Sequence, residues 1–369
     1  MKKIALYAAA GIAGVLLFAG INKKPVAPYG FALGSPEVKS ITTLTFGPTG
    51  VLFLGDSQNA SVIAFDTKDA QKATSTISYD LKGIDTKIAE ALGTTKENIT
   101  INDIAVNPVS KKLYVAVKSA DGSPILLAIS SKNEIKLVSL KDINFSSIQL
   151  NNVADAEAKD RRGTPLRMSS ISDMGFANGK LMLSGLCNKE FSSSFRAISF
   201  PFTGKQEDES TLEMYHTSHG RFETTSPIRT FTTTTIDGKG YMVASYTCTP
   251  LVLFPLDELK PGAHVKGRTI AEMGNQNTPS DMIWLTSNKQ SYLVMANTNR
   301  PVAKVSYDDI KQFQGSLTER IPGAGGTTFT KLPLEKVIQL DKLDDGRAVV
   351  LQRSTNGDVD LWTSDGKNI

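Results

Sequence analysis

The chain repeats one pattern of short β-rich runs six times, and this repeat constrains the fold more than any other feature. Each copy opens with a short apolar run, passes a tight turn, enters a second apolar run, turns again over small polar residues and closes on a third; the first copy reads ITTLTFGPTGVLFLGDSQNASVIAFD. A repeat of roughly sixty residues built from three or four short strands is typical of a β-propeller blade. The copies begin at Ile41, Ile101, Ile171, Ile228, Pro279 and Val337.

The repeats fill nearly all of the 369 residues and leave no block of different composition for a second domain. We therefore expect one all-β domain over residues 35–369, a six-bladed β-propeller with seven blades as the alternative. Residues 22–34 are predicted to be a linker, and a short helix is expected within 84–98. The ring is expected to close by pairing residues 36–40 with the blade that ends at Trp362.

The amino terminus has the pattern of an export segment. Two lysines precede an uncharged apolar run from Ile4 to Ile21. Residues 1–21 are therefore predicted to be a cleaved signal peptide or, because the run is long enough to span a bilayer, a retained signal anchor. In both cases we expect the propeller outside the cytoplasm, periplasmic or secreted, with membrane contact only through an uncleaved segment 4–21.

The charge of the chain excludes one class of partner. The formal net charge is +4, and no stripe of Lys and Arg with interleaved aromatic residues stands out. We therefore expect no nucleic-acid partner.

The connections between strands differ in length on the two faces of the predicted ring. The turns between the first two strands of a blade are tight, as in ANGK at 177–180 and DGKG at 237–240. Antiparallel alternation places the longer connections on the opposite face, where rigid scaffolds tend to carry function. These longer connections are predicted at 80–100, 142–170, 204–227, 260–278 and 311–335.

The only two cysteines of the chain fall at similar positions in adjacent repeats. An alignment of LMLSGLC (181–187) with MVASYTC (242–248) needs no gap and superimposes Cys187 on Cys248. In an exported protein such a pair is first suspected of forming a disulfide. Two buried or unpaired thiols, or ligands of a shared metal site, are the alternatives.

The connection between those two repeats holds two of the three histidines, in the run MYHTSHGRFE. His216 and His219 are three residues apart, and Glu223 follows four residues later. Imidazole with thiolate or carboxylate suits Zn or Cu. Together with Cys187 and Cys248 these residues form the candidate metal cluster, and ordinary loop histidines are the alternative.

Three aspartates stand at equivalent positions in three repeats. Asp103, Asp173 and Asp281 are the third residues of IND, ISD and PSD at the start of the innermost strands. Carboxylates that converge on the channel axis would suit a divalent cation such as Ca, which prefers oxygen ligands. Alternatively, each carboxylate accepts backbone N–H groups and fixes the start of its blade.

Other polar residues are expected around the rim of the long-loop face. Arg229 and Arg300 lie near the ends of predicted strands, and Asn299 precedes Arg300. These side chains are candidates for binding an anionic ligand or partner, and pairing with carboxylates of neighbouring blades is the alternative.

The phrase FGPTGVLFLGDS, from Phe46 to Ser57, resembles the FGPDGxLYVADS phrase of NHL-repeat and gluconolactonase-like six-bladed propellers. The resemblance covers individual blades and implies the propeller fold. In the lactonase-like enzymes it would also imply a cation in the channel, held by a first-blade glutamate and by Asn and Asp of later blades. This chain has no glutamate in the first phrase, and Ser280 stands where the family's PNG motif has asparagine.

Two functions from different classes follow from these patterns. The first is an extracytoplasmic propeller that binds a partner protein or small ligand on the long-loop face. The alternative is a metal-assisted enzyme, a lactonase-like hydrolase or an oxidoreductase, with its site at the channel mouth between blades three and four. The chain lacks GxSxG, CxxCH, P-loop and dinucleotide-binding motifs, so no catalytic residues are assigned. The cofactor expected for the enzyme is a divalent metal, Zn, Cu or Ca.

Overall fold

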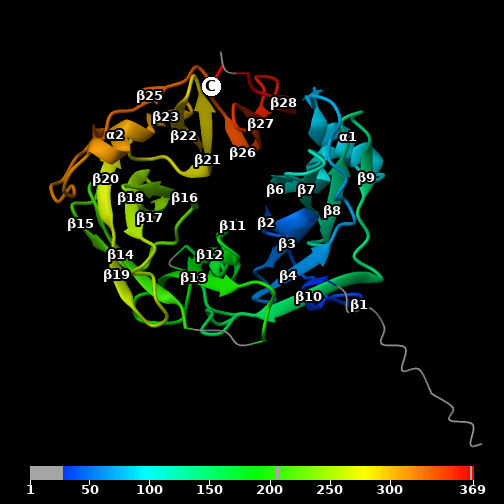
Figure 1. The fold of residues 1–369 in the computed structure, drawn as a ribbon, viewed down its shortest axis with the longest axis horizontal. Coiled ribbons are helices and arrows are strands. Elements are labelled where there is room, and N and C mark those ends of the chain that lie inside the picture. Colours follow the sequence, from blue (N-terminus) through cyan, green and yellow to red (C-terminus); the bar gives the residue numbers. More distant parts are fainter. Residues whose placement is uncertain (1–27, 161, 205–207, 366–367) are drawn as a thin grey trace, which may run out of the picture.

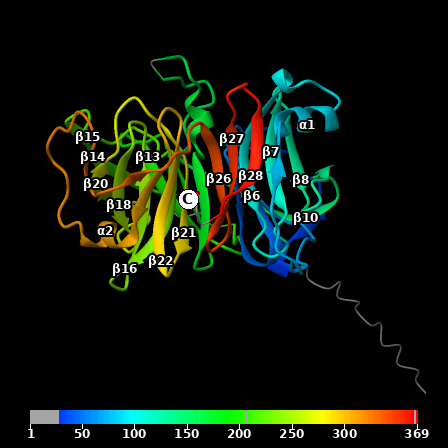
Figure 2. The ribbon, with the colours of Figure 1, turned by 90° about the horizontal axis from the view of Figure 1, so that it is seen from above.

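Six mainly antiparallel sheets surround a central channel in the computed structural model, which describes residues 28–160, 162–204, 208–365 and 368–369 (Figure 1). The chain is therefore an all-β, six-bladed propeller, as the repeats predict. The predicted export segment lies outside the described residues. Seen from the side, the strands run between two opposite faces of the ring, where the connections gather (Figure 2).

The first three sheets, numbered as blades by their innermost strands, are each given from the channel outward. Blade one contains β2 (Thr43–Phe46), β3 (Val51–Asp56), β4 (Ser61–Asp66), β10 (Ile143–Gln149) and β1 (Ala32–Gly34). Blade two contains β6 (Ile99–Val106), β7 (Leu113–Ser119), β8 (Pro124–Ile129) and β9 (Ile135–Leu137). Blade three contains β11 (Asp173–Ala177), β12 (Lys180–Leu186), β13 (Ser193–Ser199), β14 (Ser210–His216) and β15 (Arg221–Glu223), with β19 (His264–Lys266) parallel to β14.

The remaining sheets complete the ring. Blade four contains β16 (Thr230–Ile236), β17 (Lys239–Ser245), β18 (Pro250–Pro255), β20 (Arg268–Glu272) and β24 (Gly325–Gly326). Blade five contains β21 (Pro279–Ser287), β22 (Gln290–Asn297), β23 (Ala303–Ser306) and β25 (Thr330–Lys331); blade six contains β26 (Val337–Asp344), β27 (Arg347–Arg353), β28 (Val359–Thr363) and β5 (Asp80–Leu81). The helices are α1 (Ile84–Ala91) and α2 (Tyr307–Gln312), with short 3-10 turns at Pro28–Gly30, Pro48–Gly50, Lys96–Asn98 and Leu166–Ser169.

The tight turns between first and second strands lie where the sequence predicts them. Asn178 and Gly179 join β11 to β12, and both have positive φ (52° and 71°). Asp237 and Gly238 join β16 to β17 in the same way, with φ of 49° and 79°. Two consecutive left-handed residues match the right-handed twist of the strands, which explains the Asn-Gly and Asp-Gly pairs.

The blades do not follow one another around the ring in sequence order. Blade two packs between blades one and six: Leu54 of blade one shares a buried cluster with Leu126 of blade two, and Val117 of blade two shares another with Val349 of blade six. On its other side blade one packs against blade three. In Figure 1 the red blade six accordingly lies next to the cyan blade two. The chain thus builds blades one and two, returns through β10 to blade one, and then proceeds to blades three to six.

The predicted closure of the ring is wrong. Residues 80–81, not 36–40, pair with the last blade, with Leu81 opposite Leu361 and Asp80 opposite Trp362. Residues near 40 are instead held in blade one, because the backbone N–H groups of Lys39 and Ser40 donate to the Asp56 carboxylate.

The propeller also begins earlier than residue 35. Strand β1, which falls within the predicted linker 22–34, pairs antiparallel with β10 at the outer edge of blade one.

The long connections contain structure that the sequence patterns do not reveal. They supply outer strands of the blades, including β10, β14 and β20, and the predicted helix within 84–98 is confirmed as α1. Among the residues that the structure describes, no helix has the length and apolar character needed to cross a bilayer.

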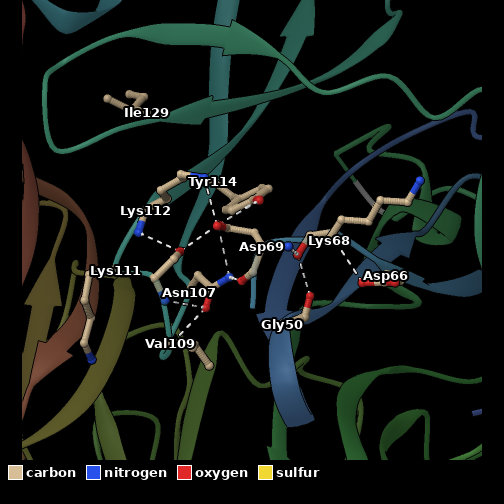
Figure 3. Close-up of polar contacts among 12 residues, drawn as sticks. Gly50, Asp66, Lys68, Asp69, Asn107, Val109, Lys111, Lys112, Tyr114 and Ile129 are labelled. Carbon is tan, nitrogen blue, oxygen red and sulfur yellow. Dashed lines mark hydrogen bonds and ion pairs between the residues drawn. The ribbon is translucent and has the colours of Figure 1, made fainter. Parts of the chain in front are cut away.

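A buried carboxylate ties blades one and two together on the tight-turn face (Figure 3). Asp69 accepts hydrogen bonds from the side chains of Asn107, Ser110 and Tyr114. Lys112 Nζ lies 2.8 Å from Asp69 Oδ1 and supplies the opposite charge. The donors meet the hydrogen-bonding needs of the buried charge, so this network fixes the interface between the two blades.

Candidate metal centre

Two turns on the long-loop face bring imidazole and thiol side chains together. The first is the β14–β15 hairpin of blade three, where His216 pairs with Arg221 across the two strands. Gly220, with φ of 67°, closes this turn by donating its N–H to the His216 carbonyl at 2.8 Å. The left-handed position favours glycine, and it holds His216 and His219 at the two ends of one short turn.

The second turn joins β17 to β18 in blade four and carries Cys248. Cys248 and Thr249 have positive φ (68° and 52°), although neither is glycine. Such residues cost of order 1–3 kcal/mol each and persist only where the surroundings hold them. Here the Cys248 N–H donates to Asn277 O at 2.6 Å, and Thr249 Oγ1 donates to Gly274 O at 2.8 Å.

The ligand atoms of the two turns are close to one another. One ring nitrogen of His216, one of His219 and the Cys248 sulfur all lie within 4.8 Å of each other. The His216 side chain is 2% exposed and that of His219 is 42% exposed. The cluster is therefore buried on one side and open at the His219 edge.

Glu223 holds both imidazoles in place. Its Oε2 lies 2.9 Å from His216 Nδ1, and its Oε1 lies 2.6 Å from His219 Nδ1. Burial alone would raise the pKa of Glu223, but hydrogen bonds from the two histidines outweigh it and lower the pKa to about 2. Glu223 is thus a carboxylate that occupies both Nδ1 atoms, so the Nε2 atoms are the nitrogens left for another ligand. His216 Nε2 is buried and has no hydrogen-bond partner among the described residues.

A second carboxyl group, Glu272 on β20, anchors the histidine turn from behind. Thr217 Oγ1 donates to Glu272 Oε2 at 2.6 Å, and the Gly274 N–H donates to Oε1 at 3.2 Å. Burial raises the pKa of Glu272, and the hydrogen bond from Thr217 opposes that shift. Because Gly274 also supports the Cys248 turn, Glu272 couples the two turns. Glu272 is not predictable from the sequence, because it lies far along the chain from the histidines and belongs to no motif.

Cys187 stands apart from this cluster, and both cysteines are unbonded. Its Sγ donates to Phe191 O at 3.6 Å, and burial raises the pKa of its thiol. Counted from the tight turns, Cys187 is the seventh residue after Lys180, and the seventh after Lys239 is Tyr246. The ungapped alignment is therefore shifted by two residues. The disulfide expected from it does not form.

The three predicted channel aspartates each connect two blades. Their Oδ1 atoms accept the N–H of the following residue. The Oδ2 atoms accept an N–H from the innermost strand of the neighbouring blade: Leu44 donates to Asp103 at 2.7 Å, Phe231 to Asp173 at 2.7 Å, and Leu340 to Asp281 at 2.9 Å. The carboxylates thus fasten adjacent blades, which favours the backbone-binding interpretation over a cation site.

A fourth aspartate shares this role and was missed in the sequence. Asp341 of blade six accepts the N–H of Val106 in blade two, and all four aspartates line a channel of about 620 Å³. Each keeps some exposed area, yet burial raises the pKa of Asp173 to about 7 and that of Asp341 to about 6. Burial, together with the charges of neighbouring aspartates, raises the pKa of Asp103 and of Asp281 well above the usual range.

The three predicted rim residues support loops near the Cys248 turn. Arg229 Nε donates to Thr247 Oγ1 at 3.2 Å, and burial lowers the pKa of Arg229. The Arg300 guanidinium donates to Asn275 O at 2.9 Å, and the Asn299 amide donates to Gln276 O at 3.0 Å. The structure thus assigns them contacts within the protein and does not group them with the channel aspartates.

Comparisons with known proteins bear on the fold alone. No family model and no curated protein matches the chain. Among solved structures, extracellular domains 1–2 of Drosophila Semaphorin 1b match with a TM-score of 0.42 and 9% identity over 90% of this chain and 86% of that one. The WD40 β-propeller domain of Doa1 matches with a TM-score of 0.33 and 10% identity over 92% and 99%. An oxidoreductase described as a glucose dehydrogenase from Thermus thermophilus matches with a TM-score of 0.33 and 9% identity over 91% and 100%.

Proposed function

We propose that this protein is an exported β-propeller that binds a transition-metal ion on its long-loop face, through His216, His219 and Cys248. Two observations carry the proposal: His216 Nε2 is buried without a partner among the described residues, and His216 belongs to a cluster with His219 and Cys248 whose ligand atoms lie within 4.8 Å of one another. A buried polar atom without a partner costs free energy, and an ion would remove that cost. The export part rests on the lysines and apolar run of residues 1–21.

The donor set selects the class of ion. Two imidazoles and a thiol suit Zn or Cu, whereas Ca prefers six to eight oxygen ligands. The nearest carboxylate, Glu223, has both oxygens engaged by the imidazoles. Ca, one of the three ions considered from the sequence, is therefore disfavoured here.

The hydrogen bonds around the three donor side chains support metal binding, because they hold these side chains in place in the protein without a metal. A carboxylate on the second nitrogen of a metal-binding imidazole fixes the ring and its tautomer, and Glu223 does this for two rings at once. The strained Cys248 turn is held by Asn277 and Gly274, which places the thiol without further rearrangement.

Metal-assisted catalysis is the second candidate function at the same residues. Three protein donors leave one coordination position free, which is the arrangement that catalytic metal sites use. The open position lies on the side of His219, whose side chain is 42% exposed, so a small ligand can reach it there.

Metal analysis of the purified full chain tests the proposal. We expect close to one equivalent of a transition metal in the native protein and loss of that metal in His216→Ala and Cys248→Ala. His264→Ala is the matched control, because His264 also contacts a carboxylate, Glu213, but lies outside the cluster. A folded native protein that binds no transition metal after incubation and dialysis would contradict the proposal.

A further inference from the structure

We infer that the ion bound at this site is copper, held in a trigonal plane by His216 Nε2, His219 Nε2 and the Cys248 thiolate. The inference rests on the proposed function, because it names the metal of the same site. Ligands about 2.0–2.3 Å from a central ion in a trigonal plane lie about 3.5–4.0 Å apart. The three ligand atoms of the cluster lie within 4.8 Å of one another, so only a small side-chain adjustment is needed for them to share one ion.

The number and kind of donors favour copper over structural zinc. Structural zinc sites almost always have four protein ligands in a tetrahedron. The cluster contains three donors among the described residues, two nitrogens and one sulfur. This His₂Cys set is the trigonal arrangement that proteins use for copper, and the general order of affinities places Cu(II) above Zn(II) at nitrogen and sulfur sites.

Carboxylates near the site are not free to support hydrolytic zinc. Many hydrolytic zinc sites use a carboxylate near the metal as a general base. Both oxygens of Glu223 contact imidazoles, and both oxygens of Glu272 accept hydrogen bonds from Thr217 and Gly274. Each of the four oxygens therefore already has a protein partner, and both carboxyl groups serve to position the ligand-bearing turns.

The surroundings also restrict how the coordination sphere can change. His216 is buried and fixed by Glu223, and the Cys248 turn is anchored at Asn277. A site held on both sides cannot easily move to admit a fourth protein ligand. Three-coordinate geometry suits Cu(I), and a soft thiolate adds to the preference for copper.

Competition between copper and zinc tests the inference. The full-length protein is stripped of metal by a chelator under reducing conditions and then freed of chelator and reductant. It is mixed with equimolar Cu(II) and Zn(II), and separately with Cu(I) under anaerobic conditions. We expect about one equivalent of copper and little zinc to remain bound, with a visible absorption band from thiolate-to-Cu(II) charge transfer. The band should disappear in Cys248→Ser and remain in Cys187→Ser, with circular dichroism showing that both variants are folded.

The outcomes separate the two proposals. One equivalent of zinc that copper does not displace would overturn the copper inference and leave the metal-binding function standing. A copper band that survives Cys248→Ser and vanishes in Cys187→Ser would overturn the assignment of the thiolate. Absence of both metals from the folded protein would overturn the inference and the proposed function together.

Discussion

Glu223 contacts both histidines of the cluster, one with each carboxylate oxygen. Because both oxygens contact imidazoles, we do not count Glu223 among the metal ligands. A carboxylate used in this way converts two flexible imidazoles into one fixed pair. Its position also explains the low pKa of its carboxyl group, since the two ring N–H groups stabilise the ionised form.

Replacement of this carboxylate should weaken metal binding without unfolding the protein. We expect Glu223→Gln to lower metal affinity by ~10–100-fold, because the amide cannot accept hydrogen bonds from both Nδ1 atoms. Titration with metal in the presence of a competing chelator measures the change. Glu213→Gln, which alters the carboxylate beside His264, is the control and should leave metal affinity unchanged.

The channel aspartates should make stability depend on pH. The pKa values of Asp173 and Asp341 are raised in the folded protein to about 7 and about 6, so folding favours their protonated forms. Their contribution is full below the ordinary aspartate pKa of about 4 and is lost as pH rises toward 7. We expect the free energy of unfolding in urea to fall between pH 5 and pH 8.

Two substitutions distinguish this source of pH dependence from others. Asp173→Asn removes one raised carboxyl group, so the fall in stability between pH 5 and pH 8 should become shallower. Asp345→Asn removes an exposed carboxyl group whose pKa is lowered by Lys342, and it should leave the slope nearly unchanged. If the free energy of unfolding falls equally steeply with pH in Asp173→Asn and in the native protein, Asp173 is not a source of the pH dependence.

At the level of single residues, sequence patterns predicted part of the site. The short spacing of His216 and His219 and the cysteine at the end of a strand placed three donors near each other. Cys187 was grouped with them because a two-residue shift in strand register cannot be seen in an ungapped alignment. Asp341 escaped detection because it follows Leu340 inside its strand and does not share the IND, ISD and PSD pattern.

Among the elements, the inner strands were predictable and the outer ones were not. The innermost strands are bounded by tight turns with Gly, Asn or Asp, and their starts fall within two residues of the predicted ones. Outer elements such as β5 and β24 contain two residues each. Each of these strands pairs with the blade beside which its long connection lies. A strand of two residues is too short to show the alternation of apolar and polar residues by which strands are predicted.

Strand β28 is expected to be essential because it lies between β27 and β5 in blade six. Deletion of residues 358–369 should prevent stable folding, since it removes a buried strand and leaves Leu81 without its partner. Leu361→Ala, at a fully buried position, is the milder version and should cost about 2–5 kcal/mol. Thermal unfolding followed by circular dichroism measures both, and an unchanged transition in either variant would contradict this assignment.

At the scale of the whole molecule, six buried clusters lie between pairs of adjacent blades and join them into a closed ring. The order of blades in that ring was not predictable, because every repeat has the same pattern of three inner strands. The pattern predicts the strands of one blade, whereas buried clusters such as the one that contains Val117 and Val349 show which blades are neighbours.

A ring in which every blade has two neighbours should unfold as one unit. The two tryptophans of the chain, Trp284 on β21 and Trp362 on β28, report on blades five and six. We expect the fluorescence transition in urea to coincide with the loss of far-UV circular dichroism, which reports on all blades. Separate transitions would indicate that part of the ring unfolds independently.

The exchange of strands between early and late parts of the chain has a consequence for biosynthesis. Synthesis proceeds from the N-terminus, so early segments become available for folding before late ones. Blades one and two, with β10, can assemble once residue 149 has emerged, but β5 must wait with an unpaired edge until β28 arrives nearly three hundred residues later. Strand β28 therefore pairs with β5, which is made much earlier, and a chain that stops before residue 359 presents an open sheet edge that chaperones and proteases can recognise.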